Sequence, residues 1–538
     1  FSRARWITEE DVETLHERHL VWWKKFWSVS EISLDDPVIE QRYYLSKYML
    51  ASVSRDPEYP PNILGISTFD RPAWNGNYKI NYNHQSPYLN LMVSGHFQQS
   101  DPHDAPYLKL MEISDEMCKR LLHHEGLYYP LGLGPHGLVS EALLLHMKSP
   151  AIHGALNMIY RYGITEDETY AQKVYPYLRG VADFWEKDLV CRDGVYHVVG
   201  DGMHERTDGN IRDNGVPEDP VNTLGYLKTF FTWMARISEA LDLDEKKREK
   251  WLEIAENLAP YPKGTIREIQ ENPTLWKEVD VKLEDLLPEE MLDKEIYYDE
   301  GIGGKWSFHF PGNVMQIYPG NAIGLGSEPE ELEVARNTVQ IHALVENALG
   351  ELEYKKALEE AEGVKNPHFY KAGAFNASNL SCLFFTAAVR VGYDPEIIWK
   401  EMRDMILNRG IPNGFLKENP HGIEQLNTIP DAIQEMMLQS CEGVIRIFPV
   451  WPSAEHPNAS FRNFRAWGGF EVSAVLKDGE VERVTILSHK GHPCRVENPW
   501  PGKSVKVSYE YGRPDEVHFG EYLNIELYKE EHAELFRI

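Results

Sequence analysis

The sequence is poor in positive charge. Its 55 Lys and Arg residues stand against 84 Asp and Glu residues, which gives a formal net charge of −29 at pH 7. A surface of this charge repels the phosphates of nucleic acids and anionic membranes. The sequence also lacks an apolar run of about 18 residues, the length that a membrane-spanning helix needs. We therefore expect neither nucleic acid nor a membrane as a partner.

Cysteine is scarce, and the usual nucleotide and nucleophile motifs are missing. No two of the five cysteines have C-x-x-C spacing, so neither a zinc site nor a disulfide framework is indicated, and buried thiols are expected. His103, His123 and His124 lack the helical spacing of zinc-protease ligands and are predicted to lie at the surface. No G-x-S-x-G elbow, Walker loop or Rossmann fingerprint occurs in a credible context. We expect no metal and no cofactor.

What the sequence does contain is a long series of helical patterns. From about residue 9 to residue 441, apolar residues recur at steps of three and four, and Gly, Pro or Asn close each segment. Residues 168–188 are one example, and Asp394 followed by Pro395 predicts the start of another helix. Roughly a dozen such segments predict six helical hairpins in a ring, an (α/α)6 barrel.

The pattern changes after Cys441. Short β-branched or alternating runs at 444–451, 469–476 and 484–487 are separated by turns that contain Pro, Asp-Gly or Gly. They predict a C-terminal antiparallel β-sandwich of about 95 residues. The domains expected are a linker helix region at 1–35, a mainly α barrel at 36–441 and the β-sandwich at 442–538.

The first candidate site is the aromatic and amide-rich stretch at 74–85, which precedes a helical segment. The side chains of Asn81 and Asn83 can donate and accept hydrogen bonds, which suits holding a water molecule or a sugar hydroxyl. An Asn-rich helix cap explains the same pattern equally well. A second stretch at 200–210 is dense in ionisable groups, and a carboxyl group there suits a general acid. A solvated turn is the plainer interpretation, and its similarity to a calcium loop is weak.

The third candidate is the segment 421–431, which leads into a helix. Its carboxylates are Glu424 and Asp431, and either is available to polarise a water molecule. Asp431 follows Pro430 in the first helical turn, where an acid usually has a structural role. Glu424 is therefore the preferred base. In 306–313, Trp306 offers ring stacking and His309 a donor to a sugar, although such a cluster more often belongs to a core.

Taken in order, these stretches resemble glycoside hydrolase family 95, the inverting α-L-fucosidases and α-L-galactosidases, over most of the chain. The similar segments are 43–50, 60–66, 74–85, 318–321 and, most specifically, 436–443 with 448–452 and 466–472. The resemblance implies that Asn81 and Asn83 activate a water molecule, that Glu205 is the general acid and that Glu424 is the base. The remaining residues that it implies in substrate binding are Trp74, Lys79, His84, His204, Arg206, Trp306, His309 and Asn427.

The sequence departs from this family at positions that bear on the sugar. Glu424 stands where the family has Asp, Lys79 where it usually has a sugar-contacting His, and Phe308-His309-Phe310 replaces a His-Arg-His run. The family also carries an N-terminal β-sandwich, so a chain that starts near the linking helix is expected to be a fragment or a shortened relative.

The function predicted is inverting hydrolysis of a terminal sugar from an oligosaccharide or polysaccharide, which is the partner expected. Two alternatives stay open: another (α/α)6 enzyme, such as a phosphorylase or a hydrolase of uronic acids, and a glycan-binding relative without activity. A phosphorylase should have clustered phosphate donors beside the base, where the sequence offers only Lys417 and His421. A homodimer and the compartment also stay open, with a secreted or periplasmic location slightly favoured.

Overall fold

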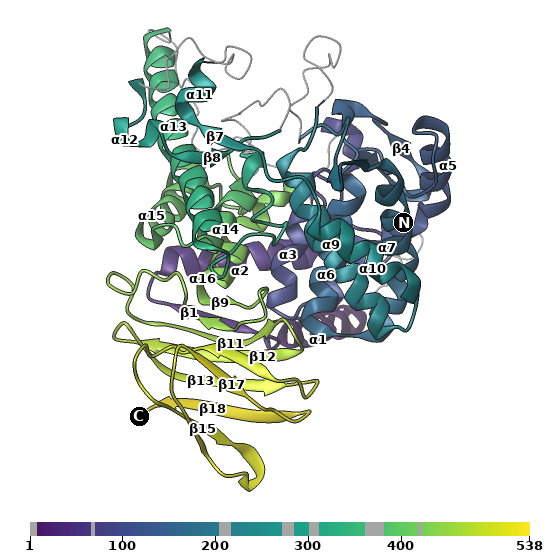
Figure 1. Ribbon diagram of the computed structural model, residues 1–538. Coiled ribbons are helices and arrows are strands. Elements are labelled where there is room, and N and C mark those ends of the chain that lie inside the picture. Colours follow the sequence, from purple (N-terminus) through teal and green to yellow (C-terminus); the bar gives the residue numbers. More distant parts are fainter. Residues whose placement is uncertain are drawn as a thin grey trace.

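The structure is a computed structural model. It describes residues 8–65, 70, 72–203, 217–271, 285–300, 311–360, 381–417 and 422–538; of these, the side chains of residues 270, 345–360 and 511 are not described. Figure 1 shows two layers, a thick body of helices and a β-sheet beneath it. The body is an (α/α)6 barrel, and the sheet belongs to an antiparallel β domain formed largely by the C-terminal part, as the sequence predicts.

Five helices form most of the inner ring of the barrel. They are α3 (Ser86–Val93), α6 (Pro150–Thr165), α9 (Val221–Ala240), α14 (Ser381–Arg390) and α16 (Thr428–Met437). Most of their residues are buried, including polar ones such as Asp431 and Gln434 of α16. Neighbours in the ring contact one another in the order α14, α16, α3, α6 and α9, and the 3-10 turn η6 (Gly312–Val314) contacts α9 on the remaining side.

A second layer of helices surrounds this ring, and several of its members bury one face against it. Its members are α2 (Pro37–Val53), α4 (Phe97–Lys109), α5 (Met111–Leu121), α7 (Glu168–Asp188), α10 (Glu245–Glu256), α13 (Pro329–Glu360) and α15 (Pro395–Asp404). In α7, the predicted face with Val174, Leu178 and Trp185 is buried, and the side chain of Asp167 caps the first turn. Asp394 likewise caps α15. Both predicted helices are confirmed.

Short elements connect the helices. The 3-10 turns are η2 (Ala73–Gly76), η3 (Pro135–Gly137), η4 (Leu144–His146) and η8 (Ile423–Leu426), and η7 (Met405–Arg409) is a π turn. The small antiparallel pairings join β2 (Tyr78–Lys79) to β3 (Gly132–Leu133) and β3 to β4 (Val139–Ser140), β5 (Val190–Arg192) to β6 (Val195–His197), and β7 (Lys263–Thr265) to β8 (Glu295–Tyr297). The short helices are α11 (Ile266–Glu271) and α12 (Glu289–Leu292).

The β domain contains one large sheet whose strands all pair antiparallel. Its order is β1 (Glu31–Leu34), β11 (Ala459–Ala466), β12 (Phe470–Lys477), β13 (Glu480–Ser488), β18 (Glu531–Arg537), β15 (Val505–Tyr509) and β16 (Glu516–His518). Two further pairs are β14 (Cys494–Glu497) with β17 (Tyr522–Ile525), and β9 (Leu438–Gln439) with β10 (Arg446–Ile447). Strict alternation of buried and half-exposed residues along β12 explains why this strand was predictable.

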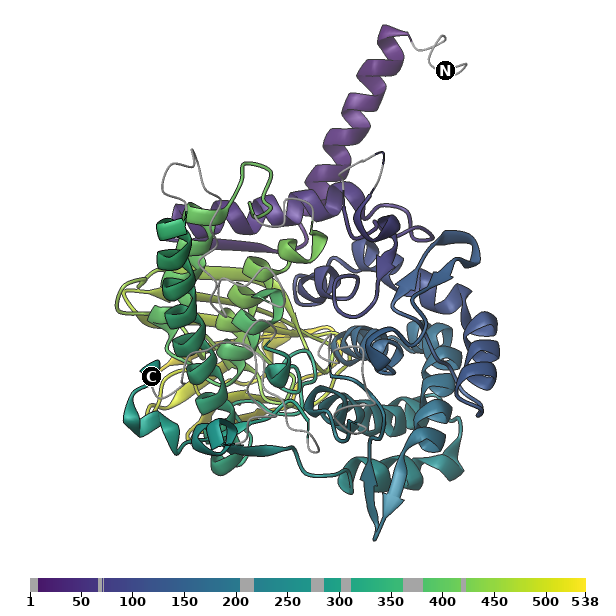
Figure 2. The same ribbon diagram turned by 90° about the horizontal axis from the view of Figure 1, so that it is seen from above.

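The N-terminal region contains an edge strand that the sequence analysis did not predict. In β1, Ile32 pairs with Phe461 of β11, so a segment expected in a helical linker completes the C-terminal sheet. With four residues, β1 is too short to show the alternation of apolar and polar residues that marks a strand. Before it, α1 (Glu9–Trp27) projects from the body, as Figure 2 shows. Within the described ranges, no helix combines the length and apolar character needed to cross a bilayer.

Two expectations about polar side chains are wrong. His103 is buried and hydrogen-bonds Asp104 through Nδ1 at 2.9 Å, because proline-interrupted α4 turns it inward. Cys191 is exposed, whereas Cys118 and two other cysteines are buried free thiols as predicted.

The indole ring of Trp467 packs the barrel against the sheet. The ring of Trp467, just after β11, packs against Trp233 and Tyr160 with centroids 5.0 and 5.2 Å away, and it lies over Gly163 of α6. The N–H of Gly468 donates to the carbonyl of Gly163 at 2.8 Å. No side chain fits at position 163.

We therefore expect Gly163→Ala to destabilise the protein by about 1–3 kcal/mol, because the new methyl group overlaps the Trp467 ring. Thermal unfolding of Gly163→Ala, Trp467→Leu and the double variant measures this effect. The double variant should lose less stability than the sum of the single changes. Purely additive losses would show that residues 163 and 467 are not in steric contact.

Candidate active site

The segment with the two predicted amides is a compact turn between β2 and α3. Asn81 is 2% exposed and Asn83 6% exposed. The N–H of Ile80 donates to the carbonyl of Leu131, and His153 Nδ1 of α6 donates to the carbonyl of Asn81 at 2.8 Å. The turn is therefore fixed at the N-terminal ends of two neighbouring inner helices.

The segment with the predicted base is the turn η8, directly before α16. Glu424 is 1% exposed, and the N–H of Ile423 donates to the carbonyl of Ile63 at 3.1 Å. Asn427 and Asp431 are also buried, one and two turns further along. This segment too lies at the N-terminal end of an inner helix.

Polar contacts join the two segments. Asn90 of α3 donates to Oδ1 of Asn427 from its side-chain nitrogen at 2.7 Å and from its backbone nitrogen at 3.2 Å. The thiol of Cys382, on α14, lies 3.7 Å from the hydroxyl of Ser86 and within electrostatic range of Glu424. The structure therefore brings the segment of Asn81 and Asn83 next to that of Glu424 and Asn427, which are more than 300 residues apart.

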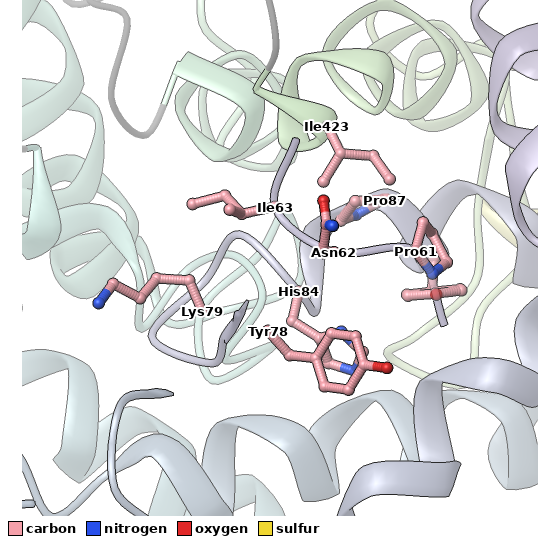
Figure 3. Close-up of a pocket in the computed structure, with 9 residues that line it drawn as sticks. Pro61, Asn62, Ile63, Tyr78, Lys79, His84, Pro87 and Ile423 are labelled. Atoms are coloured by element: carbon pink, nitrogen blue, oxygen red, sulfur yellow. The ribbon is translucent and has the colours of Figure 1, made fainter. Parts of the chain in front are cut away.

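A hollow lies between these segments (Figure 3). It contains about 200 Å³ of empty space but is too narrow to take a water molecule, and its lining is Pro61, Asn62, Ile63, Tyr78, Lys79, His84, Pro87, Tyr88 and Ile423. Figure 3 shows the Lys79 chain leading away from Tyr78 and His84. Its ammonium group pairs with the carboxylate of Glu141. The hollow lies at the junction of the two segments, and it is too narrow to bind a sugar.

His84 is packed among aromatic rings. Its Nε2 donates to the carbonyl of His103 at 3.0 Å, and the two imidazoles stack with centroids 5.2 Å apart. Burial, reinforced by the neighbouring His103, lowers the pKa of His84 to about 3. The ring is therefore neutral at ordinary pH. Trp74, in contrast, is 48% exposed in η2 and has a positive φ of 49°.

Five predicted residues lie outside the described ranges. They are Glu205, His204, Arg206, Trp306 and His309. The described residues that flank them are nevertheless informative. The N–H of Met203 donates to Oε1 of Glu300 at 3.2 Å, so the ends of the two chain segments that lead to these residues meet.

Sequence reasoning missed Asp201 and Glu300. Asp201 is fully buried and accepts from the backbone of Lys148 at 2.6 Å and from Thr223 at 2.7 Å, which fixes it to the N-terminal ends of α6 and α9. Burial raises its pKa to about 6. Glu300 is 6% exposed. Asp201 belongs to the ionisable stretch 200–210 but nothing in the sequence singles it out there, and no sequence signal marks Glu300.

Asp431 lies deeper in the barrel. Its Oδ2 accepts from Thr386 at 3.0 Å and from Asn427 at 3.2 Å. Burial raises the pKa of its carboxyl group to about 7, although Tyr318 and Thr386 donate hydrogen bonds that act in the opposite direction. Through the hydrogen bond from Asn427, the carboxylate of Asp431 orients that side chain.

One group of metal-type ligands occurs in the described part of the chain. Single ligand atoms of His197, Glu218 and Asp219 lie within 4.8 Å of one another. His197 already hydrogen-bonds Asp219 at 2.8 Å, and Glu218 forms a two-bond ion pair with Arg192. Because all three have protein partners, the cluster is explained without an ion.

An (α/α)6 barrel with buried amides and carboxylates at the N-terminal ends of its inner helices is a scaffold that carbohydrate-active enzymes use. Residues 13–352, more than half of the sequence, match the glycosyl hydrolase family 95 catalytic domain. The chain belongs to this family. No curated protein sequence matches it.

Solved structures are similar in fold. A putative kojibiose phosphorylase from human microbiome has a TM-score of 0.51 and 12% identity; the match covers 98% of this chain and 64% of the phosphorylase. An α-L-rhamnosidase from Dictyoglumus thermophilum has a TM-score of 0.46 and 12% identity, with 95% and 50% covered. The chain thus spans less than two thirds of the length of these proteins.

The raised pKa of Asp431 predicts how stability changes with pH. Between its ordinary pKa of 3.8 and its folded pKa of about 7, the folded protein keeps a proton that the unfolded chain has lost. The contribution of this group to stability is therefore full below pH 3.8 and is lost as pH rises towards 7. Asp431→Asn should remove this loss, by at most about 1.4 kcal/mol per pH unit.

Urea unfolding of the wild type and Asp431→Asn from pH 4 to pH 7 tests this prediction. Asp394→Asn, at the exposed cap of α15, controls for the exchange of Asp for Asn. The stability difference between Asp431→Asn and the wild type should shift in favour of the variant as pH rises. A constant difference would contradict the raised pKa.

Proposed function

We propose that the enzyme releases a terminal α-L-fucose or α-L-galactose unit from an oligosaccharide or polysaccharide, with inversion at the anomeric carbon. The observation that supports the proposal is the hollow at which the segment before α3, with Tyr78 and His84, meets Ile423 before α16. These segments are held together by the Asn90–Asn427 hydrogen bonds.

In the proposed reaction, Glu424 acts as the base. Its carboxylate takes a proton from a water molecule whose oxygen attacks the anomeric carbon from the face opposite the leaving group. The amides of Asn81 and Asn83 hold this water by donating and accepting hydrogen bonds. Burial suits the role, because a desolvated carboxylate interacts more strongly with a nearby proton than a hydrated one.

Glu205 acts as the general acid and gives its proton to the glycosidic oxygen as the bond to the anomeric carbon breaks. Four residues before it, Asp201 is bonded to the N-terminal ends of α6 and α9. This is the same end of the barrel at which Glu424 lies. The proposed distance between the two carboxyl groups is roughly 6.5–9.5 Å, which leaves room for the water.

The remaining predicted residues would bind the sugar. Asn427 is held between Asn90 and Asp431, so its orientation is fixed before substrate arrives. Trp74 is exposed enough to stack on a sugar face. We assign His204, Arg206, Trp306 and His309 to the same role, and we expect Lys79 and His84 to act mainly by shaping the turn that carries the amides.

We expect Glu205→Gln and Glu424→Gln to lower kcat on unactivated α-L-fucosides or α-L-galactosides by about 10²–10⁴-fold, because each removes a proton transfer. Glu245→Gln, on outer helix α10, is the matched control and should retain full activity. Steady-state kinetics measures the effect, and full activity of Glu424→Gln would exclude this base.

Chemical rescue distinguishes Glu424 from Asp431 as the base. Azide added to Glu424→Ala should restore turnover of an aryl glycoside and form a glycosyl azide, because the small anion replaces the activated water. Asp431→Ala should not be rescued. An NMR time course should show an inverted first product in the wild type, and retention of configuration would contradict the mechanism.

Two substrate tests separate the proposal from its alternatives. A panel of aryl α-L-fucoside, α-L-galactoside, β-L-arabinopyranoside and uronides identifies the sugar. Turnover that depends on phosphate would favour a phosphorylase, and binding without turnover would favour an inactive glycan-binding relative.

A further inference from the structure

A second, larger hollow opens in the outer wall of the barrel. It offers about 450 Å³ of space, within the range for ligand sites. Its walls come from α9, the end of α10, residues 258–263, β8 and the start of α13. Figure 1 shows α13 on the left, α9 and α10 on the right, and β7 and β8 between them. None of its lining residues belongs to the hollow in Figure 3.

The hollow reaches through the outer helical layer to the inner ring. Leu224 and Lys228, one helical turn apart on inner helix α9, form part of its wall. Residues 221–227 and 229–231 are buried, whereas Lys228 is exposed. Solvent therefore reaches an inner helix of the barrel at this point.

Two tyrosines form an aromatic corner inside this hollow. The rings of Tyr261 and Tyr297 meet edge to face with centroids 5.7 Å apart, and the ammonium group of Lys228 lies 5.8 Å from the Tyr261 ring. The hydroxyl oxygen of Tyr261 is buried and has no hydrogen-bond partner in the described part of the chain. Buried polar atoms are almost always hydrogen-bonded, so this hydroxyl points to a ligand or a water molecule.

Half of the remaining lining residues are apolar, and the charged ones are mostly acidic. Carboxylates come from α10 and from the start of α13, at Glu256, Glu328, Glu330 and Glu331, and Lys263 adds a cation that pairs with Glu295 at 2.9 Å. This charge disfavours phosphate and other anions. Aromatic faces beside hydrogen-bond acceptors and donors fit a ring with C–H faces and hydroxyl edges.

From these observations we propose that the hollow is a second carbohydrate-binding site, which holds a neutral or amino sugar unit of a glycan away from the catalytic centre. The choice of a saccharide rests on the proposed function, but the location does not. One sugar face packs on Tyr261, the tyrosine hydroxyl and Lys228 bond its hydroxyl groups, and the carboxylates accept from the outer hydroxyls.

Hydrogen–deuterium exchange tests the site with a defined probe, a pool of neutral fucosylated and galactosylated oligosaccharides of three to six units. The Glu424→Gln enzyme is used so that the pool is not consumed. Peptides covering 255–263 and 328–334 should exchange more slowly with the pool present. Absence of protection at these peptides would overturn the proposal.

Three further variants in the same background assign the protection to this hollow. Tyr261→Ala should weaken the affinity derived from protection by about fivefold, and Tyr261→Phe, which removes only the hydroxyl, should weaken it less. Tyr528→Ala, an exposed tyrosine of the β domain, is the control and should leave protection unchanged. Equal protection in Tyr261→Ala and the control would contradict the site.

The two proposals fail in different ways. If the wild type does not hydrolyse aryl glycosides, the proposed reaction is wrong. The exchange result is unaffected by that outcome. Tyr261→Ala made in the wild-type background should keep its hydrolysis, while the same change in the Glu424→Gln background weakens protection at 255–263.

Discussion

The structure depends on one pair of hydrogen bonds at the centre of the barrel, those from Asn90 to Oδ1 of Asn427. They tie α3 to the turn before α16 and so join an early segment of the chain to a late one. Below them, Lys47 donates to the Asn90 side chain at 2.8 Å, and Asp431 accepts from Asn427. A buried amide pair leaves little freedom of orientation, because every unmade hydrogen bond there costs the desolvation of a polar group. The positions of Asn81, Asn83 and Glu424 follow from this junction.

The same network shows why a barrel is a suitable scaffold for this chemistry. The inner helices start at one end of the ring, so residues before α3, α6, α9 and α16 lie close together although they are distant in sequence. Their helix dipoles point positive ends towards that region, which favours negatively charged groups such as a carboxylate base. The outer wall is less complete, because between α10 and α13 the layer opens as far as Lys228 on an inner helix. The barrel thus has two hollows that differ in place, one at the N-terminal ends of its inner helices and one in its outer wall.

Periodicity predicted the elements that bury one face, such as α7 with Val174 and Trp185, and capping residues such as Asp394 predicted where helices begin. The pattern did not predict β1, because a strand of four residues is too short to show a period. It also placed His103 at the surface, because the burial of a polar ring depends on partners such as Asp104 that only the fold supplies. In the site, Asn81, Asn83 and Glu424 could be named from family-like segments. The Asn90–Asn427 junction, Asp201 and Glu300 could not, since they become significant only when distant segments meet.

The most direct test of the central claim is a crystal structure with an iminosugar of fucose configuration, whose cationic ring mimics the charge that develops in the transition state. The account predicts that the ring lies at the N-terminal ends of α3 and α16, with Glu424, Asn81 and Asn83 within hydrogen-bond distance of the ring or of one water molecule beside its anomeric position. An iminosugar bound elsewhere in the barrel, with residues 81, 83 and 424 out of reach, would contradict it.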